Sequence, residues 1–422
     1  MLERYFVRPE TVDRVRASWI GGPIEQYVGW LTEKKYTVRS ICRRVPILMR
    51  FGEFARGRGA ATWEELPAHV KPFVAAWVEE RGRRCVTERE SKGVASSART
   101  PIEQMLRLVL PDFVGTGRPR RLRDAFADRA PGFFRYLRHE RGLRPASLDH
   151  YRYNLVKFEG YLERIGLGDL RTLSPIVLSS FVTESSGSLS QSGIQAICRC
   201  LRVFLRYLHR EGHVADDLSR TVECPMRYRL ANVPRSIPWG DVQKMLGSVD
   251  RRGKVGKRDY AILALLVTYG LRAREVAALT LDDIDWNRER LMVPERKAGH
   301  STAYPLSAVV GEAILDYLRS ARPETLDRHV FIRAIAPQTP LTGGAVSARV
   351  AHYLRKAGIS VPLPGSHTLR HTCVQRLLDS GFPLKTIGDY VGHRSYASTE
   401  IYSKVSIEEL REVAMGDAED IL

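Results

Sequence analysis

Apolar residues recur every three or four positions through most of the N-terminal half of this chain, and this spacing constrains the fold more than any other feature. One series runs from Ile24 through Leu31 to Phe51, and a second begins at Phe133 and ends near Gly212. A polar loop is expected within the second series, at 185–193. Because this spacing puts the apolar side chains on one face of a helix, we expect the N-terminal half to consist of packed amphipathic helices.

Two segments interrupt the helical series and suggest domain limits. The segment 115–123 combines glycine and proline with four arginines, so it is either an arm that contacts phosphates or a solvated linker. The segment 231–238 contains two prolines and cannot continue a helix. We therefore expect an N-terminal helical domain at 1–118, a second helical domain at 119–222, a linker at 223–238 and a C-terminal domain at 239–422.

The two helical regions are weakly alike, because three apolar positions recur at a nearly constant offset. A duplicated helical module would explain this likeness, and so would chance similarity between two amphipathic regions. The matching pairs are Leu31 with Leu137, Phe51 with Phe158, and Phe73 with Phe181.

The C-terminal region predicts short helices, a strand pair and further helices. The strands are expected at 291–294 and 302–306, on either side of a turn at 297–301, and helices are expected to resume at Thr368. The preceding helices are expected at 241–246, 259–267 and 273–279. The predicted fold class is mainly α with a small antiparallel β-sheet.

Charge and composition narrow the choice of partners. The chain has 66 Lys and Arg against 48 Asp and Glu, a formal net charge of +18. Such an excess favours polyanions, with nucleic acid the first candidate, although ribosome-associated and membrane-surface proteins share the property. The six cysteines show no CxxC spacing, and the longest apolar run, 261–267, is too short to span a bilayer. We expect a cytoplasmic protein with reduced thiols and no membrane partner.

Three C-terminal motifs carry residues suited to chemistry on a phosphate. They read Gly270-Leu-Arg-Ala-Arg-Glu275, His367-Thr-Leu-Arg-His-Thr372, and Val391-Gly-His393 followed by Tyr402. Taken singly, each has a structural explanation, such as a surface arginine or a core histidine beside a salt-bridged arginine. Taken together, their order and spacing make coincidence improbable.

The three motifs resemble those of the tyrosine recombinase, or phage integrase, family. That family is recognised by G-L-R-x-x-E, then H-x-L-R-H-T, then L-G-H with a tyrosine nine residues after the histidine; Val391 here replaces the usual leucine. The resemblance covers about residues 236–405, and 125–217 is similar to the family's core-binding domain. It implies helical N-terminal DNA-binding domains followed by a catalytic domain.

The resemblance also implies a role for each motif residue. Arg272 and Arg370 would clamp the scissile phosphate, because guanidinium groups stay protonated and bind phosphate oxygens in pairs. Glu275 would orient Arg272 or support the fold. By analogy with the family, His367 would accept a proton and His393 would donate a hydrogen bond to the phosphate.

The nucleophile and the general acid complete the implied site. Tyr402 would attack the phosphorus and form a 3′-phosphotyrosyl link, with Tyr396 wrongly spaced for this role. Lys297, on the expected hairpin turn, would protonate the departing 5′ oxygen; it could instead be an ordinary turn lysine, and Arg296 is its nearest rival. The reaction would need no metal, no cofactor and no ATP.

The family implies double-stranded DNA as the partner and a tetramer on two sites, alone or with other recombinases. A helix expected to start at Ile407 would dock on a neighbouring protomer or fold back onto its own domain. Two other functions stay open. The first is a type IB topoisomerase, which usually has Ser-Lys-x-x-Tyr; this chain has Ser398-Thr-Glu-Ile-Tyr402, without that lysine. The second is a DNA-binding protein that does not cut DNA, and the presence of every expected catalytic residue argues against it.

Overall fold

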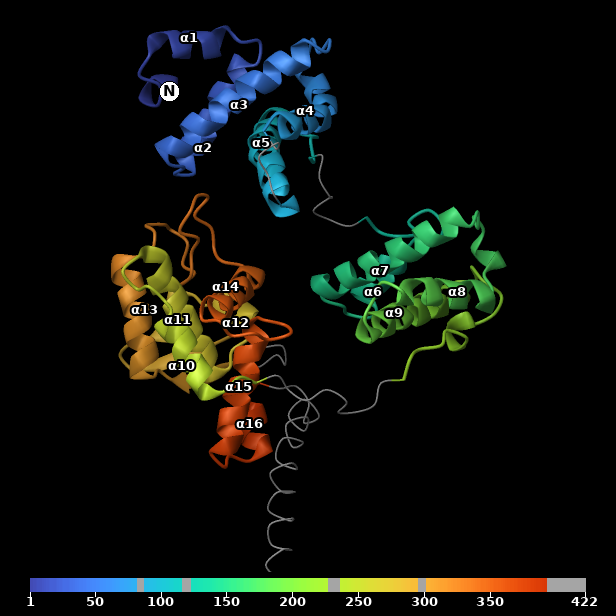
Figure 1. Ribbon diagram of the computed structural model, residues 1–422. Coiled ribbons are helices and arrows are strands. Elements are labelled where there is room, and N and C mark those ends of the chain that lie inside the picture. The colour runs from blue at the N-terminus through green and yellow to red at the C-terminus, as the bar shows by residue number, and fades with distance from the viewer. Residues whose placement is uncertain (82–86, 116–122, 227–235, 295–300, 393–422) are drawn as a thin grey trace, which may run out of the picture. The chain divides into compact units, whose positions relative to one another are not determined.

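The computed structural model describes residues 1–81, 87–115, 123–226, 236–294 and 301–392 (Figure 1). By their contacts, Met1–Pro111 and Asn232–Leu422 group as one unit and Asp112–Ala231 as another. The described chain is mainly helical with one small antiparallel sheet, so the predicted fold class is confirmed.

The N-terminal region is a helical block with an aromatic core. Thr37 and Thr87 cap two of its helices by accepting hydrogen bonds from the amides of Ser40 and Glu90. Phe73 packs edge-on against Phe51, with ring centroids 5.4 Å apart. The helices are α1 (Pro9–Ala17), α2 (Gly21–Glu33), α3 (Val38–Arg56), α4 (Leu66–Arg81) and α5 (Glu88–Val109).

Among its described residues, the second unit has four α-helices around another aromatic core, in which Phe133 contacts Phe204 with ring centroids 5.0 Å apart. Ser174 and Ser190 cap the last two helices. The loop expected at 185–193 is shorter than predicted, because these two helices enclose its ends. The helices are α6 (Phe133–His139), α7 (Pro145–Arg164), α8 (Pro175–Ser186) and α9 (Gln191–Arg210).

The three residue pairs that suggested duplication fall on helices in the same order. Leu31, Phe51 and Phe73 lie on α2, α3 and α4, and their counterparts Leu137, Phe158 and Phe181 lie on α6, α7 and α8. All six side chains are buried. This common order is what a duplicated module predicts, and duplication stays our interpretation.

The C-terminal region combines a three-stranded antiparallel sheet with seven described α-helices. The strand order is β1-β2-β3, and Leu291 pairs with Tyr304 in the β2–β3 ladder. The strands are β1 (Ile284–Asp285), β2 (Arg290–Val293) and β3 (Thr302–Pro305). The helices are α10 (Trp239–Gly247), α11 (Lys254–Tyr269), α12 (Ala273–Ala278), α13 (Ala308–Ser320), α14 (Gly343–Lys356), α15 (Ser366–Asp379) and α16 (Leu384–Val391).

The expectation that helices resume only at Thr368 was wrong, because α13 and α14 precede α15. The signal was present in the sequence: Val310, Ile314 and Tyr317 follow helical spacing, and all three are buried. Figure 1 shows α13 beside α11, and burial of this apolar face against α11 accounts for the helix.

Helix α11 is the centre of the C-terminal core. Its Ile262, Leu263, Leu265 and Leu266 are fully buried. The buried carboxylate of Asp259 accepts hydrogen bonds from Arg258 on its own helix, and from Arg349 Nε (2.7 Å) and the Tyr353 hydroxyl (3.2 Å) on α14. Since a buried charge is tolerated only when it is paired, this cluster fixes α14 against α11.

Two other expectations concern cysteines and membranes. The five cysteines among the described residues are free thiols. None of the helices in the described ranges has both the length and the apolar character needed to cross a bilayer.

Candidate active site

A left-handed glycine at the end of α11 delivers Arg272 to the site. Gly270 has φ 58°, and a Cβ placed on it would lie 3.1 Å from Val391 Cγ1 and 3.2 Å from Cys373 Sγ. Glycine is therefore favoured twice, by its backbone conformation and by the closeness of α15 and α16. The chain turns here, Leu271 is buried, and Arg272 becomes the N-cap of α12.

Glu275 holds both ends of Arg272. One carboxylate oxygen accepts the backbone N–H of Arg272 at 2.8 Å, and the other accepts its Nη1 at 2.7 Å. The Arg272 side chain is 18% exposed and that of Glu275 is 8% exposed, so solvent screens this ion pair only partly. The guanidinium is thus oriented by its own helix before any substrate arrives.

Arg370 reaches the same place from α15. Its residue is only 4% exposed, and it donates from Nη1 to the carbonyl of Gly270 (2.6 Å) and from Nη2 to the carbonyl of Val391 (2.7 Å). Arg272 Nη2 donates to the carbonyl of Gly392 at 2.8 Å. The two arginines therefore bind consecutive carbonyls at the end of α16, directly before position 393.

Two histidines on α15 lie in the field of these arginines. Burial lowers the pKa of His367 below its usual value, and the positive charges of Arg370 and Arg272 lower it further. Burial, with His367 and Arg370 nearby, lowers the pKa of His371 to about 4. The imidazole of His367 is therefore neutral at neutral pH and able to accept a proton.

Three tyrosines connect the sheet to the arginine cluster. Tyr304 on β3 donates to the carbonyl of Tyr390 on α16, and Tyr390 donates to the carbonyl of Thr268 at 3.0 Å. Tyr269 donates to the carbonyl of Pro305 (2.9 Å) and accepts the amide of Ser307 (2.8 Å). These bonds fix β3 to the end of α11 and to the end of α16.

Four of the predicted site residues lie together: Arg272, Glu275, His367 and Arg370. Three other predicted site residues lie outside the described residues: Lys297, His393 and Tyr402. The same holds for Arg296, for Tyr396 and for the helix expected from Ile407.

Sequence reasoning did not find the tyrosine connections or the carbonyl partners of the arginines. The available signal was weak: Tyr269 directly precedes Gly-Leu-Arg, and Tyr390 directly precedes Val-Gly-His. Within the described part of the chain, no three His, Cys, Asp or Glu side chains gather as a metal site would require.

Two regions of the chain match known family patterns. Residues 237–409 match the phage integrase family, and residues 131–212 match the N-terminal SAM-like domain of phage integrases. The helices α6 to α9 lie in the second of these regions.

Individual relatives agree with the family match. A protein of Sinorhizobium fredii that carries the name integrase/recombinase y4rA is 36% identical over 67% of this chain and 68% of its own length. Tyrosine recombinase XerD of Mycobacterium tuberculosis is 30% identical over 68% of this chain and 95% of its own.

Among solved structures, a lambda integrase tetramer bound to a Holliday junction superimposes with a TM-score of 0.51 at 17% identity, covering 63% of this chain and 74% of its own; this likeness concerns the fold.

The matches favour neither a topoisomerase nor a non-cutting DNA-binding protein. Together with the order of the three motifs, they show that this chain belongs to the phage integrase, or tyrosine recombinase, family and is a site-specific recombinase, an enzyme that cleaves and rejoins DNA.

Proposed function

We propose that this chain cleaves one strand of duplex DNA by attack of the Tyr402 hydroxyl on a phosphodiester, forming a 3′-phosphotyrosyl link and releasing a 5′ hydroxyl. The reverse attack, by a 5′ hydroxyl of another strand, then rejoins the DNA. One phosphate ester replaces another in each step, so the bond energy is conserved and no nucleotide cofactor is consumed.

What supports the proposal is the convergence of two guanidinium groups beside a neutral histidine at the first turn of α15. Negative charge builds on the non-bridging phosphate oxygens in the transition state, and fixed cations in a partly dehydrated site stabilise that charge. Arg370 is buried and Arg272 is held by Glu275, so little reorganisation is needed when the phosphate arrives. The N-terminus of a helix adds its own attraction for an anion.

Proton transfers are assigned to three further groups. His367, neutral at neutral pH, accepts the proton of the Tyr402 hydroxyl, whose free pKa of about 10 makes it a weak nucleophile otherwise. Lys297 protonates the departing 5′ oxygen, and His393 donates a hydrogen bond to a non-bridging oxygen. The role of His393 is supported by its neighbours in the chain: Arg370 binds the carbonyl of Val391 and Arg272 binds the carbonyl of Gly392, the two residues that precede it.

The partner is duplex DNA, with two sites joined by four copies of the chain. The net charge of +18 favours a polyanion, and the lambda integrase relative is recorded as a tetramer on a Holliday junction. We also infer a cytoplasmic location, where the DNA substrate can be reached.

The test is a nicked suicide substrate carrying the recombination site, incubated with the full chain and analysed on a denaturing gel. Wild type is expected to leave a covalent protein–DNA adduct, and Tyr402→Phe is expected to leave none while binding the DNA as tightly. Tyr396→Phe is the matched control and should still form the adduct. An adduct that persists in Tyr402→Phe would refute the assignment, and its loss in Tyr396→Phe would identify Tyr396 as the nucleophile instead.

A further inference from the structure

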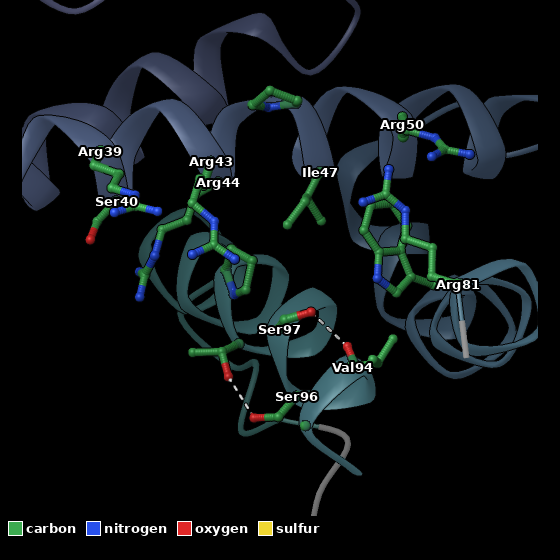
Figure 2. A pocket seen from close by; sticks show the side chains of 15 residues that line it. Arg39, Ser40, Arg43, Arg44, Ile47, Arg50, Arg81, Val94, Ser96 and Ser97 are labelled. Carbon is green, nitrogen blue, oxygen red and sulfur yellow. Dashed lines mark hydrogen bonds between the residues drawn. The ribbon is translucent and has the colours of Figure 1, made fainter. Parts of the chain in front are cut away.

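A groove in the N-terminal block has five arginines among its fifteen lining residues, and it lies outside both regions that match the integrase family. It has a volume of about 790 Å³ and is formed by α3, α4 and α5. Arg39, Arg43 and Arg44 extend into it from one part of α3, and Arg50 and Arg81 stand at its other end (Figure 2). Five arginines thus line a single depression, and one of them, Arg44, also donates to the Tyr27 hydroxyl (2.6 Å) and to Gln104 Oε1 (2.7 Å).

The far end of the groove is organised by an aromatic ring. The guanidinium groups of Arg50 and Arg81 lie 5.1 and 4.2 Å from the ring centroid of Trp77, within the range of cation–π contact. Such contacts restrict two flexible side chains and keep both charges in the groove.

The charge of the groove is poorly neutralised. None of the described residues that line it is acidic. Glu80, outside the lining, pairs with Arg50 at 2.7 Å and compensates the charge of this arginine. Because both side chains are about half exposed, the pair contributes little stability and can open to an entering anion at little cost. Arg39 and Arg43 are exposed on successive turns of α3. Like charges this close repel one another, and an anion that enters the groove relieves the repulsion.

The opposite wall of the groove, formed by α5, carries small side chains and hydroxyl groups. Gly93 has no atom within 4 Å of the position that a Cβ would take, so the helix surface is open there. Ser97 donates to the carbonyl of Val94 at 2.7 Å, and Ser96 and Thr100 share a hydrogen bond of 3.4 Å (Figure 2). Arginines together with serine and threonine hydroxyls are the side chains that typically contact DNA phosphates.

We propose that this groove binds the sugar-phosphate backbone of duplex DNA, giving each protomer a DNA contact additional to those of its two family-matched regions. From Arg39 to Arg50 helix α3 rises about 16 Å, the length of roughly five base pairs of B-form DNA. The contact is independent of sequence, because it is made to phosphates. The choice of DNA as occupant rests on the proposed function; the groove and its charge do not.

The test compares two full-length variants that lose the same charge. Arg39→Gln/Arg43→Gln removes two positive charges from the groove. Arg8→Gln/Arg14→Gln removes two exposed arginines of the same block that do not line the groove. Fluorescence anisotropy with a random-sequence duplex several helical turns long gives affinity over a range of salt concentrations.

The groove variant should reduce the slope of log affinity against log salt by about 1.8, and should weaken binding at ~0.1 M salt by roughly 10- to 100-fold. The control should bind nearly as wild type does. Equal losses in both variants would overturn the proposal, because only net charge would then matter. Weaker binding of poly-glutamate with unchanged binding of DNA would also overturn it, and would indicate an acidic protein partner.

Adduct formation separates this inference from the proposed function. At saturating suicide substrate the groove variant should still form the Tyr402 adduct. If wild type forms no adduct but the two variants differ in DNA affinity, the proposed chemistry fails and the groove proposal stands. If the adduct forms and the two variants bind alike, the groove proposal alone fails.

Discussion

Replacing Gly270 by alanine tests the packing that brings the two arginines together. An L-residue in the left-handed region costs about 1–2 kcal/mol. The new methyl would lie 3.1 Å from Val391 Cγ1 and 3.2 Å from Cys373 Sγ, so these neighbours must shift by a few tenths of an ångström, at about 1 kcal/mol. The lower entropy of the unfolded alanine chain recovers about 0.4–1 kcal/mol. The net loss of unfolding free energy is therefore about 2 kcal/mol.

The functional effect should exceed the loss of stability. The Gly270 carbonyl accepts Arg370 Nη1 at 2.6 Å, so a shift of this turn displaces a guanidinium proposed to hold the phosphate. We expect single-turnover adduct formation to slow by at least roughly tenfold at a temperature where the variant is folded, since small misplacements in an active site are costly.

Gly358→Ala is the matched control. Gly358 also has a positive φ, 73°, but nothing lies within 4 Å of its Cβ position. It should lose only the conformational part of the stability and keep wild-type adduct formation. Urea unfolding and a suicide-substrate time course measure both quantities. If Gly270→Ala matched Gly358→Ala in both assays, the packing argument would be refuted.

Two further predictions concern the same cluster. Glu275→Ala removes both hydrogen bonds to Arg272, so it should lower the free energy of unfolding by about 2–4 kcal/mol and slow DNA cleavage. Glu275→Gln keeps an acceptor for the Arg272 amide and should therefore lose less stability and less activity. Equal behaviour of the two variants in urea unfolding and in cleavage would contradict this. Because the folded-state pKa of His371 is lowered to about 4, its stabilising contribution should be complete above pH ~6.5 and lost as the pH falls toward 4. The urea midpoint should therefore depend less steeply on pH in His371→Gln than in wild type, and an equally steep dependence in the variant would contradict this.

Much of the fold followed from local sequence. Helical spacing indicated that the N-terminal half is helical, because a helix that covers a core needs an apolar stripe along one face. The β2–β3 pair was predicted from two short apolar runs around a turn, and β2 and β3 lie there. Helices α13 and α14 were not predicted. The loop at 185–193 was predicted to be longer than it is, since periodicity indicates apolar faces but does not show where a helix ends.

By itself the sequence determined which residues are available for chemistry: Arg272, Glu275, His367 and Arg370 stand in motifs whose spacing is local and readable. Only the tertiary structure decided that Arg370, a hundred residues from Gly270, binds its carbonyl, and that Tyr304 fixes β3 to α16. It also decided that arginines of α3 and α4 share one groove with the small face of α5. The physical reason is that such contacts depend on how whole helices pack, which no local spacing encodes.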